Sequence, residues 1–113
     1  MKFPKDFPRK GELYYVSAAE STGSEIRGNR HAVIVSSDKL NKNSGVVMVV
    51  YVTTKNKSAS RFHVDISTKQ THRVALCEQV FTVDKSRLCE YKGCIAPFHQ
   101  ENIDEALAYT LSL

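Results

Sequence analysis

The seven residues Val46–Val52 constrain the fold of this chain most. They read Val-Val-Met-Val-Val-Tyr-Val, an almost continuous apolar run in which valine dominates. Branched side chains of this kind favour strands, and a run without polar alternation is typical of a strand that is covered on both faces. We therefore predict a strand over 46–52 at the centre of a sheet.

Shorter strand patterns surround this run. Over 62–66, apolar residues alternate with His63 and Asp65, which places these two side chains on the opposite face from their neighbours. The polar stretch from Asp38 to Gly45 has the composition of a turn. Asp84 is suited to cap a single helical turn. Further strands are predicted at 12–18 and 31–37, and residues 73–83 predict either a pair of strands or one bent strand.

The last segment carries the clearest helical pattern. Its apolar positions follow the spacing of one helix face: Ile103, Ala106, Leu107, Thr110 and Leu111. We expect this helix to pack on the sheet. Many short strands with one terminal helix indicate a mainly β domain, built as a small closed or half-closed barrel.

Length and composition bound the remaining classes. With 113 residues the chain predicts one domain over 10–113, preceded by an extension over 1–9 that reads as a solvated tail. Neither a membrane-spanning run nor a signal peptide is found, so we expect a cytoplasmic protein. The three cysteines do not have the spacing of a zinc site, and we expect free thiols with neither a metal nor another cofactor.

Charge is distributed unevenly along the chain. Residues 1–61 hold eleven Lys and Arg against five Asp and Glu, whereas residues 62–113 hold five against seven. A basic half favours a polyanionic partner. The basic stretch 23–31 contains two glycines and two arginines, and an arginine fork suits two oxygens of one phosphate. Taken alone, this stretch reads equally well as a solvated surface loop.

Five stretches in order carry a resemblance to a known family: Lys10-Gly-Glu-Leu-Tyr-Tyr, Gly23-Ser-Glu-x-x-Gly-x-Arg30, Val52-Thr53, His63-Val-Asp-Ile and Glu78-Gln-Val-Phe-Thr-Val-Asp-Lys-Ser-Arg-Leu88. The sequence resembles the MazF/PemK/Kid toxins of bacterial toxin–antitoxin systems. The resemblance implies an SH3-like barrel of the MazF/CcdB type with a C-terminal helix, acting as a homodimer. It implies a metal-independent endoribonuclease that cuts single-stranded RNA at a short sequence. The 2′-hydroxyl would attack, leaving 2′,3′-cyclic phosphate and 5′-hydroxyl ends. The implied partner is an antitoxin with an acidic, disordered tail.

The resemblance also implies a catalytic set. Arg30 would stabilise the pentavalent phosphorane, because an arginine with a pKa above about 12 is a poor proton donor at neutral pH. Thr53 would orient the phosphate or the 2′-hydroxyl. Glu78 is the proposed base; a salt bridge from Glu78 to Arg73 or Arg87 is an equally weighted alternative.

Other positions complete the expected site. The residues expected to position the loop and the RNA are Ser24, Glu25, Arg27, Lys55, Lys57 and Arg61. Family members usually have proline where this chain has His31, which could replace the base but starts on the opposite face from Arg30. Tyr14 or Tyr15 could stack on bases, although tyrosines in strands more often belong to the core. His63 and His99 are assigned to structure.

A second class of function competes with catalysis. The same barrel carries gyrase poisons in a sister family, and an altered relative could bind RNA or an antitoxin without cleaving anything. Such a protein needs neither Arg30 nor Thr53. The two residues therefore separate the enzyme from the binding protein.

Overall fold

The computed structural model describes residues 3–17, 30–57 and 59–113. These residues form six strands, two α-helices and one 3₁₀ turn. In chain order they are β1 (Glu12–Val16), β2 (Arg30–Ile34), α1 (Asp38–Asn43), β3 (Val46–Thr53), β4 (His63–Asp65), β5 (Val74–Asp84), η1 (Lys85–Arg87), β6 (Leu88–Cys94) and α2 (Pro97–Leu111).

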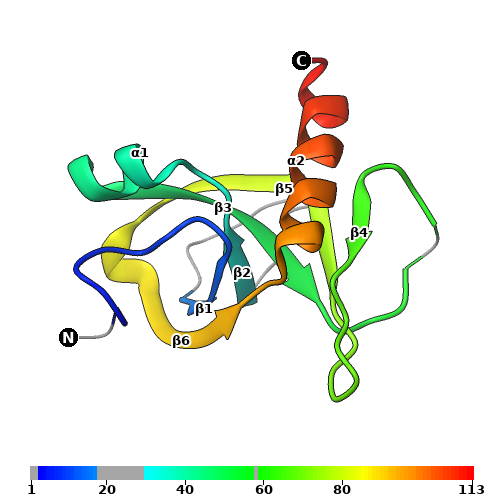
Figure 1. The fold of residues 1–113 in the computed structure, drawn as a ribbon, viewed down its shortest axis with the longest axis horizontal. Helices are drawn as coiled ribbons and strands as arrows, with labels where there is room; N and C mark the ends of the chain where they lie inside the picture. The colour runs from blue at the N-terminus through cyan, green and yellow to red at the C-terminus, as the bar shows by residue number, and fades with distance from the viewer. Residues whose placement is uncertain (1–2, 18–29, 58) are drawn as a thin grey trace.

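The six strands form one antiparallel sheet in the order β4-β5-β3-β2-β1-β6. The apolar run lies in β3, between β2 and β5, which confirms the prediction of a central strand. Helix α2 stands against β4 and β5 (Figure 1). The mainly β class with a C-terminal helix is therefore confirmed.

The core has two clusters, one on each face of the sheet. We call the face covered by α2 the helix face. Its cluster contains Leu13, Val33, Val50, Val52, Ala75 and Ile103. The opposite face, which we call the far face, buries Tyr14, Val16, Ala32, Ile34, Val49, Tyr51 and Leu88. Because side chains alternate along a strand, these lists assign a face to every neighbouring position in the sheet.

Strand β5 is one bent strand, the second of the two predicted alternatives. Tyr51 pairs with Leu76, but the preceding residue Val50 pairs with Val80. Residues 77–79 are therefore extra in β5 and form a bulge, which bends the strand. Beyond the bulge, the ring of Phe81 stacks on Tyr51 with their centroids 4.8 Å apart.

One local prediction is corrected, and one strand was not predicted. The stretch predicted as a turn contains α1, whose N-cap Ser37 accepts a hydrogen bond from the Leu40 N–H at 3.2 Å. Asn41 is fully buried there, and its Nδ2 donates to the Ser36 carbonyl at 3.0 Å. Polar residues that usually mark turns thus form a short helix here, because the N-cap and the buried side-chain hydrogen bond provide partners for their polar groups. Strand β6 had no prediction, since its sequence lacks apolar alternation.

The N-terminal segment also differs from a solvated tail. Residues 3–10 hold neither helix nor strand, as the two prolines predict, but Phe7 and Pro8 are buried. The Lys10 N–H donates to Asp38 Oδ1 at 2.8 Å. The segment is therefore fixed against α1, while its boundary with the domain stays a prediction.

The expected terminal turns and helix are present. Asp84 caps η1 by accepting from the Ser86 N–H at 2.8 Å, which confirms the predicted cap. In α2, Ile103 and Ala106 are buried as predicted, whereas Leu111 at its end is exposed. The cysteines are free thiols, with Cys77 buried. Neither helix in the described parts of the chain is long and apolar enough to cross a membrane.

Candidate active site

Arg30 and Thr53 lie at neighbouring strand ends. Strand β2 begins at Arg30 and β3 ends at Thr53. The two strands pair His31 with Val52, so the same register sets Arg30 opposite Thr53. Arg30 also pairs with Val16, a residue of the far face. Both candidate side chains therefore start on the far face.

The polar atoms of these two residues have different surroundings. The Arg30 Nε atom is buried and has no hydrogen-bond partner among the residues described. A buried N–H without a partner carries a desolvation cost, so it is a donor ready for an acceptor from outside. The Thr53 hydroxyl oxygen accepts from the Lys55 N–H at 3.1 Å. Its own O–H remains a donor.

Glu78 is joined to His63 at the same face. Its Oε2 lies 3.1 Å from His63 Nε2. His63 of β4 pairs with Leu76 of β5, and Thr53 of β3 pairs with Val74, two residues earlier in β5. The pair is accessible, with the His63 side chain 19% and the Glu78 side chain 42% exposed.

This contact bears on the alternatives left open for Glu78, whose role as the base stays a prediction. Glu78 was expected to be a base or to pair with Arg73 or Arg87. The Arg87 guanidinium instead donates to the Ser17 carbonyl at 3.0 and 2.8 Å. His63, assigned to structure alone, is the partner of Glu78. The alternation over 62–66 already placed His63 away from the core, but the sequence did not indicate that β4 would lie beside the bulge.

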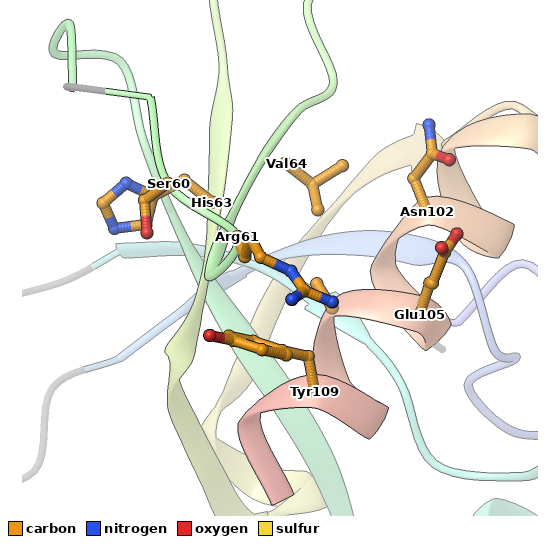
Figure 2. Close-up of a pocket in the computed structure, with 8 residues that line it drawn as sticks. Ser60, Arg61, His63, Val64, Asn102, Glu105 and Tyr109 are labelled. Atoms are coloured by element: carbon orange, nitrogen blue, oxygen red, sulfur yellow. The ribbon is translucent and has the colours of Figure 1, made fainter. Parts of the chain in front are cut away.

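The basic residues after β3 divide into two groups. Lys55 and Lys57 are exposed. The Arg61 guanidinium carbon lies 3.7 Å from the centre of the Tyr109 ring on α2. Figure 2 shows the two side chains beside each other. Arg61 is therefore held by a cation–π contact beside a cavity of 190 Å³ that Glu105 also lines. The expected Ser24, Glu25 and Arg27 lie outside the described residues.

Comparison with known proteins assigns the family. The model of PemK-like, MazF-like toxins of type II toxin–antitoxin systems matches residues 9–111. The chain belongs to this toxin family. The match covers β1 to α2 completely, and with them Arg30, Thr53 and Glu78.

Solved structures share the fold of this toxin. MazF from Deinococcus radiodurans superposes with a TM-score of 0.85 at 22% identity, covering 96% of this chain and 100% of that one. A mycobacterial endoribonuclease in complex with its cognate antitoxin gives 0.78 at 24%, covering 94% and 96%. The MazE–MazF complex (Form-III) from D. radiodurans gives 0.78 at 21%, covering 94% and 97%. At these identities the likeness establishes the fold.

His31, which stands where the family usually has proline, faces away from the site. Its ring lies on the helix face, 5.2 Å from the ring of Tyr15. Burial lowers the pKa of His31, and the nearby Arg73 and Lys92 lower it further. His31 is therefore no partner for Arg30 on the far face. Pairing with Val16 of β1 fixes the Arg30 backbone without a proline.

The two tyrosines of β1 lie on opposite faces of the sheet. Tyr14 is completely buried, and its hydroxyl donates to Glu12 Oε1 at 3.0 Å. Burial and the Glu12 carboxylate raise the pKa of Tyr14. Tyr15 packs on the helix face beside His31. The expectation of stacking is therefore wrong for Tyr14, whose ring fills the core instead.

Proposed function

We propose that this toxin is an endoribonuclease that cleaves single-stranded RNA at a short sequence, without a metal ion. The 2′-hydroxyl would attack the adjacent phosphorus, and the products would be a 2′,3′-cyclic phosphate and a 5′-hydroxyl. The observation that carries the proposal is that Arg30, whose buried Nε has no partner among the described residues, lies at a strand end next to that of the Thr53 hydroxyl. Family membership and the similar structures named endoribonuclease support it.

Arg30 would stabilise the charge that develops on phosphorus. Its guanidinium can donate two parallel hydrogen bonds to the equatorial oxygens of the phosphorane. The buried Nε reaches no acceptor in the described chain, so a phosphate oxygen would not have to displace a protein partner. Fixed donors of this kind contribute about 10²- to 10³-fold in rate.

Thr53 would orient the scissile phosphate. Because the Lys55 N–H binds the hydroxyl oxygen, the hydroxyl proton is directed to another acceptor. A non-bridging phosphate oxygen beside Arg30 is such an acceptor. In this arrangement Thr53 fixes the position of phosphorus and the exposed Lys55 adds positive charge.

Glu78, with His63, would supply proton transfer. A carboxylate bonded to an imidazole can take the proton of the 2′-hydroxyl and share it with the ring, while the departing 5′-oxygen takes a proton from solvent water and leaves as a hydroxyl. His63 lies two strands away from Thr53 across the sheet and is offset from it by two residues along the strands. This separation places their Cα atoms about 12 Å from each other. The long Arg30 and Glu78 side chains both start on the far face, so RNA laid across this face would meet both pairs.

The proposed partners follow from charge and family. Single-stranded RNA would lie over the basic region of Lys55, Lys57 and Arg61, with further contributions from Ser24, Glu25 and Arg27. A cognate antitoxin with an acidic, disordered tail would compete for the same surface. The toxin would act in the cytoplasm as a homodimer.

Cleavage of a long RNA by the purified toxin tests the proposal. We expect discrete new 5′-hydroxyl ends, a rate unchanged by a chelator, and complete resistance of an all-DNA or 2′-O-methyl substrate. Intact RNA that nevertheless binds the protein would favour the alternative, a non-catalytic binding protein. A strict requirement for a divalent metal would overturn the mechanism.

A further inference from the structure

A second cavity lies on the far face beside the proposed phosphate site. It has a volume of 340 Å³ and is lined by Lys57, His63, Asp65, His72 and Val74, among others. Thr53 pairs with Val74, and Val74 pairs with Asp65. Thr53 is therefore aligned across three strands with two residues that line the cavity. The distance across two strand spacings is about 10 Å, which one ribonucleotide spans from its phosphate to the far edge of its base.

The polar groups of this cavity are fixed. The Ser67 N–H donates to Asp65 Oδ1 at 2.9 Å, and the Ser67 hydroxyl lies 3.1 Å from His72 Nδ1. His63 is fixed by Glu78. These bonds hold Asp65, His72 and His63 in place before any ligand arrives. A small, pre-formed pocket with a few oriented polar groups is typical of a site for a small organic group.

Asp65 gives the cavity a fixed negative charge. The hydrogen bonds from Ser67 hold the pKa of Asp65 below its usual range, so the carboxylate is ionised at neutral pH and only accepts hydrogen bonds. A carboxylate accepts about four hydrogen bonds, and Ser67 leaves room for others. An anion would repel a phosphate, so Asp65 suits the uncharged, donor-bearing edge of a base.

We propose that the cavity formed by Asp65, His63 and His72 is a nucleobase subsite that selects guanine in the RNA. Guanine presents two adjacent donors, N1–H and the N2 amino group, which match the two oxygens of one carboxylate. The flat imidazoles of His63 and His72 provide surfaces on which a base can stack. This inference rests on the proposed function and adds the base that the site reads.

Asp65→Asn is the sharpest variant. Asn preserves the acceptor that Ser67 binds and therefore the turn, but replaces one carboxylate oxygen with a donor. Glu101→Gln removes one negative charge from an exposed position of α2 and serves as the matched control. The experiment uses the full chain, with GMP and inosine monophosphate as probes followed by NMR of the histidine rings. Inosine monophosphate lacks only the N2 amino group.

We expect GMP to shift the His63 and His72 signals at millimolar concentration and to bind about 10-fold more tightly than inosine monophosphate, since a bidentate contact discriminates by about 10- to 100-fold. Asp65→Asn should abolish the difference and Glu101→Gln should keep it. Absence of shifts, or equal preference in Asp65→Asn, would overturn the subsite.

Cleavage of a randomised RNA pool separates this inference from the proposed function. Wild-type cleavage with a guanine preference at one position that Asp65→Asn loses supports both. Cleavage whose base preference Asp65→Asn leaves unchanged overturns the subsite and retains the nuclease. A toxin that cleaves nothing, yet loses its GMP preference in Asp65→Asn, retains the subsite and overturns the nuclease.

Discussion

Replacing Arg30 with methionine should separate activity from stability. Met keeps most of the length of the side chain and removes every donor. The buried Nε of Arg30 has no partner in the described chain, and an unsatisfied buried donor costs about 1–3 kcal/mol. Arg30→Met should therefore leave the free energy of unfolding unchanged or raise it by up to about 2 kcal/mol. Cleavage should fall by about 10²- to 10³-fold, because the phosphorane loses its main donor.

Arg87→Met is the matched control. The Arg87 guanidinium donates twice to the Ser17 carbonyl, at 3.0 and 2.8 Å. Loss of a charged donor should cost about 1.5–3 kcal/mol. For a domain of this size the melting temperature would fall by about 4 °C for each kcal/mol. The cleavage rate per folded molecule should stay unchanged.

Denaturant unfolding and RNA cleavage, measured on both variants, test the reasoning. If Arg30→Met loses as much stability as Arg87→Met, Arg30 is a structural residue and its unsatisfied nitrogen is not a functional signal. If Arg30→Met keeps more than about a tenth of the wild-type rate, the expected contribution of a fixed donor is refuted.

Three further predictions concern proton transfer, pH and thiols. Glu78→Gln should lower the cleavage rate by about 10²- to 10⁴-fold without changing the far-UV circular dichroism, and retained activity would remove Glu78 as the base. His31 has a folded-state pKa below its ordinary value of 6.5, so the unfolded chain binds more protons as the pH falls below that value. The melting temperature should therefore drop between about pH 7 and pH 5, and the drop should be smaller in His31→Gln; equal drops would refute the assignment. Burial raises the pKa of the Cys77 thiol to about 12, so a thiol reagent should label only Cys89 and Cys94 in the native toxin and reach the third thiol after unfolding. Native labelling of Cys77 would show that its core opens.

Local patterns predicted the frame of this fold. Three patterns indicate which face of an element is buried: the apolar run of β3, the alternation around His63 and the spacing of α2. Each pattern can be recognised from residues that are close together in the sequence. The same patterns placed Arg30 and Thr53 at strand ends. They missed α1 because Asn41 is buried by a specific bond to Ser36, and composition alone assigns asparagine to turns.

Pairings between distant segments could not be predicted in this way. The Glu78–His63 bond depends on how β4 aligns with β5, and that alignment is set by the whole sheet. The aromatic ring of Tyr14 is of a type that can stack on a base. However, β1 lies between β2 and β6, and the Tyr14 side chain is buried there. Tertiary context, which no local pattern contains, decided both outcomes.

The bulge in β5 also makes the segment that carries Glu78 able to change in length. Cys77 and Val80 both contact the helix-face cluster although they lie three residues apart, so the alternation of side chains is broken between them. Deletion of one residue between them would restore the even spacing of a regular strand, and Val83 would keep its place in the far-face core. The sheet beyond the bulge can thus stay in register while the segment that holds Glu78 beside His63 becomes shorter.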